Sequence, residues 1–130
     1  MPPRELDELG DLQKRILELL WQGGEGTVHD VLARISDDPK PAYTTILTVL
    51  QKLEKAGWVT HRRDGRSHVY RPRQSHDEAR AGSLKGLMSR VFSGDPKLLV
   101  QTLIKQQDMS ADDLAALQSL IEQRKREMES

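Results

Sequence analysis

Hydroxyl, amide and ammonium groups lie at helical spacing in the segment 42–59. At about 100° per residue, one side of a helix through this segment carries Thr44, Leu47, Thr48, Gln51 and Lys55. The opposite side is apolar and consists of Ile46, Val49, Leu50 and Leu53. Threonine is a mediocre helix former, and an ordinary solvated face would carry Glu, Lys, Gln and Arg instead. Hydroxyls, a primary amide and an ammonium group can bind phosphates and base edges.

Three helices are predicted in the first part of the chain, and the third of them carries this polar face. The first spans 11–22, carries an apolar stripe and stops at Gly23-Gly24. Thr27 is expected to cap a short second helix, with Asp30 three residues later in a capping box. Pro39 and Pro41 break the chain before the third helix, which is predicted over 42–56 and ends at Gly57.

A β-hairpin is predicted directly after the third helix. Asp64-Gly65 separates two β-like runs, and Asp-Gly between such runs is a strong hairpin signal. A hairpin alone is marginal in water, so it must pack on the helices. The expected points of attachment are Trp58, Val59, Val69 and Tyr70. Three helices followed by a hairpin indicate a winged helix-turn-helix.

Charge is distributed unevenly along the chain, although its net charge is +0. Residues 1–39 carry net −5 and residues 74–130 carry net −1. Residues 40–73 hold eight Lys/Arg and two Asp/Glu, which gives net +6. A basic segment that coincides with a helix-turn-helix and its hairpin favours a nucleic-acid partner.

The pattern therefore predicts a helix that enters the major groove of DNA, with the hairpin as a wing. The residues predicted to read bases are Thr44, Leu47, Thr48 and Gln51. The residues predicted to contact the backbone, in the helix and in the 58–71 wing, are Thr45, Lys40, Lys52, Lys55, Arg62, Arg63 and Arg66.

Each of these residues also has a simpler interpretation. Thr44 could cap the helix start, and Thr45 could be a mid-helix compromise. Leu47 could belong to a protein interface, and the arginines could be ordinary solvated hairpin side chains. A winged-helix module for protein–protein interaction is thus the alternative function.

Three further amphipathic helices are predicted in residues 74–130. Ser93 to Pro96 form a turn between two of them, and Ser110 with Asp113 caps the last. Their stripes are too small for a separate core, so packing against a second copy is expected. The residues predicted to form that dimer interface are Leu84, Leu87, Val91, Leu99, Leu103, Ile104, Leu114, Leu117 and Ile121. The predicted organisation is a winged-helix DNA-binding domain over 1–73 and a helical dimerisation region over 74–130, in a mainly α fold with one small β-hairpin.

The segment "AYTTILTVLQKLEKAGWVTHRRDGRSHVYRP" closely resembles the penicillinase repressor family, the BlaI/MecI/CopY group of bacterial transcription repressors. The resemblance extends to "LGDLQKRILELLW" and to "VFSGDPKLLVQTLIKQQDMSADDLAALQSLIE", and so covers nearly the whole chain. It implies a homodimer that binds inverted-repeat operator DNA and represses transcription. It also implies a membrane sensor metallopeptidase as a partner, which triggers cleavage within the dimerisation region.

The chain departs from the family pattern in two places. Gln101-Thr102 stands where the family has its Asn-Phe cleavage pair. The copper-responsive branch has a cysteine-rich tail, and this chain has no cysteine. That absence also excludes disulfides and thiolate metal sites.

Other functional classes find little support in the residues. No nucleophile motif or phosphate loop is present, and we predict neither an enzyme nor a cofactor. His61 and His68 lie on opposing predicted strands and could meet, but two histidines without a placed carboxylate or cysteine make a poor metal site. No apolar run is long enough to span a membrane, and the start lacks a signal core, so a cytoplasmic location is expected.

Overall fold

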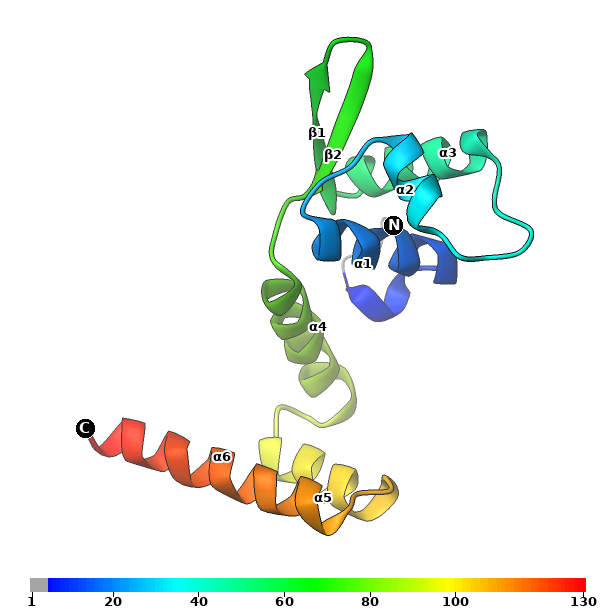
Figure 1. The fold of residues 1–130 in the computed structure, drawn as a ribbon. Coiled ribbons are helices and arrows are strands. Elements are labelled where there is room, and N and C mark those ends of the chain that lie inside the picture. The colour runs from blue at the N-terminus through cyan, green and yellow to red at the C-terminus, as the bar shows by residue number, and fades with distance from the viewer. Residues whose placement is uncertain (1–4) are drawn as a thin grey trace. The chain divides into compact units, whose positions relative to one another are not determined.

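The computed structural model describes residues 5–130, which divide into two compact units. The first unit ends at Leu87, and the second runs from Met88 to Ser130. After a short 3-10 helix (Leu6–Glu8), the elements are α1 (Asp11–Gly23), α2 (Val28–Arg34), α3 (Tyr43–Lys55), β1 (Val59–Asp64), β2 (Ser67–Pro72), α4 (His76–Val91), α5 (Pro96–Gln106) and α6 (Ala111–Glu129) (Figure 1). The prediction of a mainly helical chain with one hairpin is confirmed.

The ends of the first three helices follow their capping residues. α1 ends before Gly24, whose φ of 85° few other residues tolerate. In α2 the predicted capping box is formed, because Thr27 accepts from the Asp30 amide at 3.1 Å and Asp30 accepts from the Thr27 amide at 2.9 Å. The latter bond lowers the pKa of Asp30, so the cap stabilises α2 at neutral pH and is lost in acid. Gly57, with φ 90°, follows the end of α3.

The core of the first unit lies between α1, α2, α3 and the hairpin. Its fully buried side chains include Ile16 and Leu20 from α1, Val31 from α2, and Ile46 and Leu50 from α3. The four predicted attachment points of the hairpin are all buried, with exposed fractions of 7% or less: Trp58, Val59, Val69 and Tyr70. The apolar faces predicted from the helical period therefore meet in one core.

The hairpin extends from the helices as a two-stranded antiparallel ribbon (Figure 1). Asp64 pairs with Ser67, so Gly65 and Arg66 form the turn, and Gly65 has φ 62°. Gly26, just before α2, also pairs with Tyr70 through backbone bonds of 2.9 and 2.8 Å. The start of α2 is thereby joined to the base of the wing, a pairing that the sequence pattern did not indicate.

The beginning of α4 belongs to the first compact unit. The Trp21 indole donates to the Gln74 carbonyl at 2.9 Å, and its ring stacks on His76 with centroids 4.2 Å apart. Ala79 is 1% exposed and packs in the core. The boundary between the units falls within α4, at Leu87.

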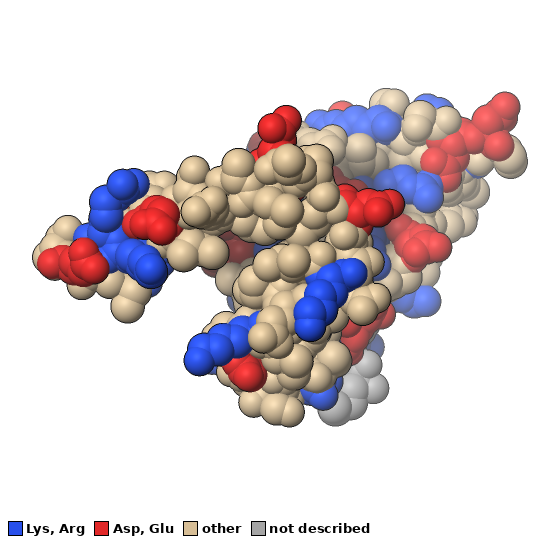
Figure 2. Space-filling view, turned by 90° about the horizontal axis from the view of Figure 1, so that it is seen from below, with Lys and Arg blue, Asp and Glu red and all other residues tan. Residues whose placement is uncertain are grey.

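The second unit contains α5 and α6, and neither helix has a buried residue. Asp95 caps α5, and the predicted Ser110/Asp113 box caps α6. Broad areas of uncharged surface lie between scattered acidic and basic side chains (Figure 2). Of the nine predicted dimerisation residues, six are exposed and Leu87, Leu99 and Leu117 are half-buried. The chain alone thus leaves these apolar side chains in water. No helix within residues 5–130 is long and apolar enough to cross a membrane.

Candidate nucleic-acid interface

Helix α3 separates its apolar and polar faces as the sequence predicts. Ile46, Leu50 and Leu53 are fully buried, whereas all the threonines and Gln51 are exposed. The N-cap residue of α3 is Ala42, and no side chain makes a capping hydrogen bond there. Thr44 lies inside the helix and therefore does not cap it. Lys52 and Lys55 are exposed in the last turn. The hydroxyl and amide face is therefore free for a partner.

Two residues of this face differ from the sequence expectation. Leu47, expected to be exposed, is half-buried and packs against the core. The Thr48 hydroxyl donates to the carbonyl of Thr44 at 2.9 Å, one turn earlier in the helix. Both side chains are held in place before any partner binds, which lowers the entropy cost of binding.

Other predicted backbone contacts lie around the helix. Thr45 is exposed on the first turn of α3. The Lys40 ammonium donates to the Leu32 carbonyl at 3.1 Å near the end of α2, and its residue is exposed. Lys40 therefore caps α2 in the unbound chain.

The three wing arginines are not equivalent. Arg63 and Arg66 are exposed, and their guanidinium groups have no hydrogen bond or ion pair with any of residues 5–130. Arg62 donates to Glu25 at 2.9 Å, and this hydrogen bond and the carboxylate charge raise the pKa of Arg62. Two wing arginines are thus free for a phosphate, and one is already paired.

A second polar contact fixes the wing to α3. His61 Nδ1 lies 2.6 Å from a Glu54 carboxylate oxygen, and the His61 ring stacks on His68 with centroids 4.3 Å apart. The predicted meeting of these two histidines is confirmed. No group of three or more His, Cys, Asp or Glu among the described residues is arranged to hold a metal. The contact joins the end of the helix to the hairpin.

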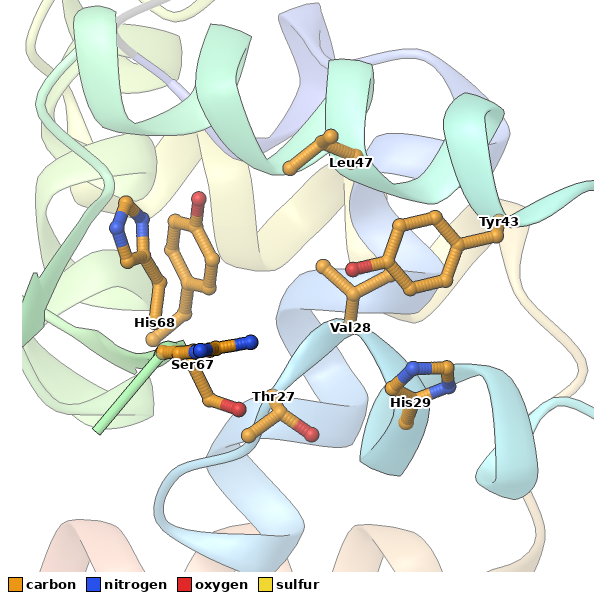
Figure 3. Close-up of a pocket in the computed structure, with 9 residues that line it drawn as sticks. Thr27, Val28, His29, Tyr43, Leu47, Ser67 and His68 are labelled. Carbon is orange, nitrogen blue, oxygen red and sulfur yellow. The ribbon is translucent and has the colours of Figure 1, made fainter. Parts of the chain in front are cut away.

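A cavity of about 230 Å³ lies between α2, α3 and the hairpin. Its polar lining consists of Thr27, His29, Tyr43, Arg66, Ser67 and His68, and its apolar lining of Val28, Leu47 and Tyr70. In Figure 3, Tyr43 and His29 lie on one side, His68 and Ser67 lie on the other, and the Tyr43 hydroxyl points between them. The Tyr43 ring lies 4.8 Å from that of His29.

The sequence reasoning missed most of the cavity residues. Tyr43 had a signal, because it lies four residues before Leu47 on the same side of the helix. His29, Ser67 and His68 had none, since only the folded hairpin brings them to α3. Glu25 was missed for the same reason, being 37 residues from Arg62.

Comparison with known proteins identifies the family of the chain. The family model for the penicillinase repressor matches residues 9–123. The chain belongs to the penicillinase repressor family. It is 42% identical over 79 residues to the transcriptional regulator BlaI of Mycobacterium tuberculosis, a match that covers 60% of this chain and 57% of that protein. The chain thus aligns with a little over half the length of that relative.

The penicillinase repressor of Bacillus licheniformis aligns more completely. It is 20% identical over 122 residues, which cover 94% of this chain and 95% of that protein. An ArsR-like transcriptional regulator from Rhodococcus has a similar fold, with a TM-score of 0.50 and 17% identity over 76% of this chain and 86% of that one. The family assignment and the winged-helix fold are thereby confirmed.

Proposed function

We propose that this member of the penicillinase repressor family is a homodimeric transcriptional repressor. Helix α3 enters the major groove of an inverted-repeat operator, and the hairpin contacts the adjacent backbone. The observation that carries the proposal is the exposed hydroxyl and amide face of α3 beside the unpaired Arg63 and Arg66, in a segment of net charge +6. A chromosomal target implies a cytoplasmic location, and a repressor needs no catalytic group.

The exposed apolar residues of α5 and α6 support a homodimer. Fully burying one Leu or Ile contributes about 1.5–3 kcal/mol, and association costs about 4–15 kcal/mol. The nine residues of the predicted interface are enough to outweigh that cost. Gln101 and Thr102, which replace the family's Asn-Phe cleavage pair, are both exposed on α5. We further propose that a signal relieves repression by acting on this region, with a sensor metallopeptidase as the candidate that the family resemblance suggests. Mapping the ends of any fragments of this protein in induced cells tests whether the chain is cut in this region.

The first test is to sequence genomic fragments that the protein retains and to measure affinity for them over a salt series. A repressor should prefer an inverted repeat, and log K should fall linearly with log salt, by about 0.9 for each phosphate contacted. A protein-interaction module would show neither preference nor a steep slope. That result would reject DNA binding and support the alternative.

Replacing Arg63 or Arg66 by Ala should weaken binding to every DNA sequence. A guanidinium that contacts one phosphate contributes about one unit to the salt slope, and its removal should reduce the slope by that amount. The measurement is the salt dependence of affinity for the operator and for an unrelated duplex. Unchanged slopes for all of the Arg62, Arg63 and Arg66 variants would place the wing away from DNA.

Glu25→Gln should have the opposite effect. The neutral amide no longer competes with phosphate for Arg62, so affinity for all DNA should increase and the slope should steepen by up to about one unit. Glu18→Gln, an exposed acidic residue of α1 without this ion pair, is the control. Equal effects of the two variants would show that net charge, rather than release of Arg62, is responsible.

A further inference from the structure

The cavity between α2, α3 and the hairpin has the lining of an anion site. Arg66, His29 and His68 can each present N–H donors to it, and Tyr43 and Ser67 present hydroxyls. None of its nine lining residues is acidic. Guanidinium, hydroxyl and imidazole groups are the donors that proteins use for phosphate oxygens.

Several of these donors are unused in the free chain. Within residues 5–130, no hydrogen bond or ion pair involves the Arg66 guanidinium, the Tyr43 hydroxyl or the Ser67 hydroxyl. The Thr27 hydroxyl accepts from Asp30 but keeps its own hydrogen for donation. The volume of about 230 Å³ is several times the roughly 30 Å³ share of a water molecule in the liquid, so it can hold a phosphate group.

The place of the cavity identifies the source of that phosphate. Leu47, from the predicted base-reading face, forms part of its lining, and Arg66 lies in the hairpin turn. A duplex that meets both Leu47 and Arg66 therefore lies against two of the residues that line the cavity. A small anion in the same place would have to leave before DNA could bind.

We propose that this cavity binds one phosphate of the DNA backbone in each half-site, with Tyr43, Ser67 and His68 completing a contact begun by Arg66. The inference rests on the proposed function and extends it to residues outside the base-reading face. It explains why Tyr43, a large side chain that is 41% exposed, lies at the first position of α3.

The test pairs protein variants with duplexes that carry a single neutral methylphosphonate. In the full-length wild type, neutralising the phosphate in the cavity should weaken binding about tenfold. Tyr43→Phe removes only the hydroxyl and should weaken binding to the unmodified duplex about 3–10-fold, the usual range for one hydrogen bond. For the Tyr43→Phe variant, a methylphosphonate at the phosphate in the cavity should cause little further loss of affinity. At every other position, a methylphosphonate should weaken its binding as much as it weakens binding of the wild type. Ser67→Ala should give the same two results as Tyr43→Phe. Ser36→Ala changes an exposed serine outside the cavity and should leave both the affinity and its dependence on that methylphosphonate unchanged.

Each other outcome has a definite meaning. If the variants weaken binding to all methylphosphonate duplexes by the same factor, the cavity is not a backbone contact. If inorganic phosphate, titrated without DNA, binds at micromolar concentration and displaces the duplex, the cavity is a small-anion site and the assignment to DNA is wrong. If the wild type binds no duplex at all, the proposed function fails as well.

Discussion

A chain that ends at Leu87 is expected to stay folded, to be monomeric and to bind an inverted repeat about 10²–10⁴-fold more weakly than the full chain. We place the truncation at Leu87, not at the end of the hairpin, because Trp21 contacts residues that follow the hairpin. Its indole donates to the Gln74 carbonyl and its ring stacks on His76. Ending at Pro72 would expose the indole and the surface that Ala79 covers. Sedimentation of both chains, paired with binding to whole and half repeats, is the measurement.

A point variant gives the same result without deleting a helix. Ile121→Glu puts a carboxylate into the apolar side of α6, where Ile121 is 52% exposed in the single chain. It should dissociate the dimer, because burying an unpaired charge at an interface is costly. Gln118→Glu, an exposed position in the same helix, adds the same charge and should leave the dimer intact. A full-length monomer, or a truncated chain that binds the repeat undiminished, would overturn the dimer proposal.

Alanine at Thr44, Thr48 or Gln51 should reduce operator affinity by about 1–3 kcal/mol for each hydrogen bond to a base that the substitution removes. Affinity for an unrelated duplex should hardly change, since these side chains do not carry the phosphate attraction. The measurement is the ratio of operator to nonspecific affinity for each variant at one salt concentration.

Thr102→Ala is the matched control for Thr48→Ala. The Thr102 hydroxyl donates to the Leu98 carbonyl at 2.8 Å in α5, just as Thr48 donates to Thr44 in α3. The two substitutions therefore cost similar local helix energy, and a difference in operator affinity reports contact with DNA. Parallel decreases in operator and nonspecific binding would show that α3 does not read sequence through these residues.

The helical period and the turn residues predicted the elements of the fold because both are local signals. Apolar residues at helical spacing located α1 to α6, and Asp64-Gly65 located the hairpin. Caps at Thr27 and Ser110 were equally visible, since each involves partners only three residues away.

Contacts between distant segments were not predictable in this way. The Gly26 pairing with Tyr70 and the Arg62 pairing with Glu25 depend on how the hairpin folds back on the α1–α2 loop. Leu47 was expected to be exposed because the helical period places it opposite the core. The nearby start of α2 and the hairpin cover part of that side, which makes it half-buried. The period gives the direction of a side chain from its own helix, but not what approaches it.

The intrahelical bond of Thr48 limits which bases it can distinguish. A hydroxyl has one hydrogen, and that of Thr48 is directed to the Thr44 carbonyl. Toward the groove the oxygen can then only accept, and the donors on the major-groove edges are the amino groups of adenine and cytosine. Guanine O6 and thymine O4 are also acceptors, so the Thr48 hydroxyl oxygen would face a lone pair there and could form no hydrogen bond. Thr48 should therefore select the amino-bearing member of a base pair and, with it, the strand on which that base lies.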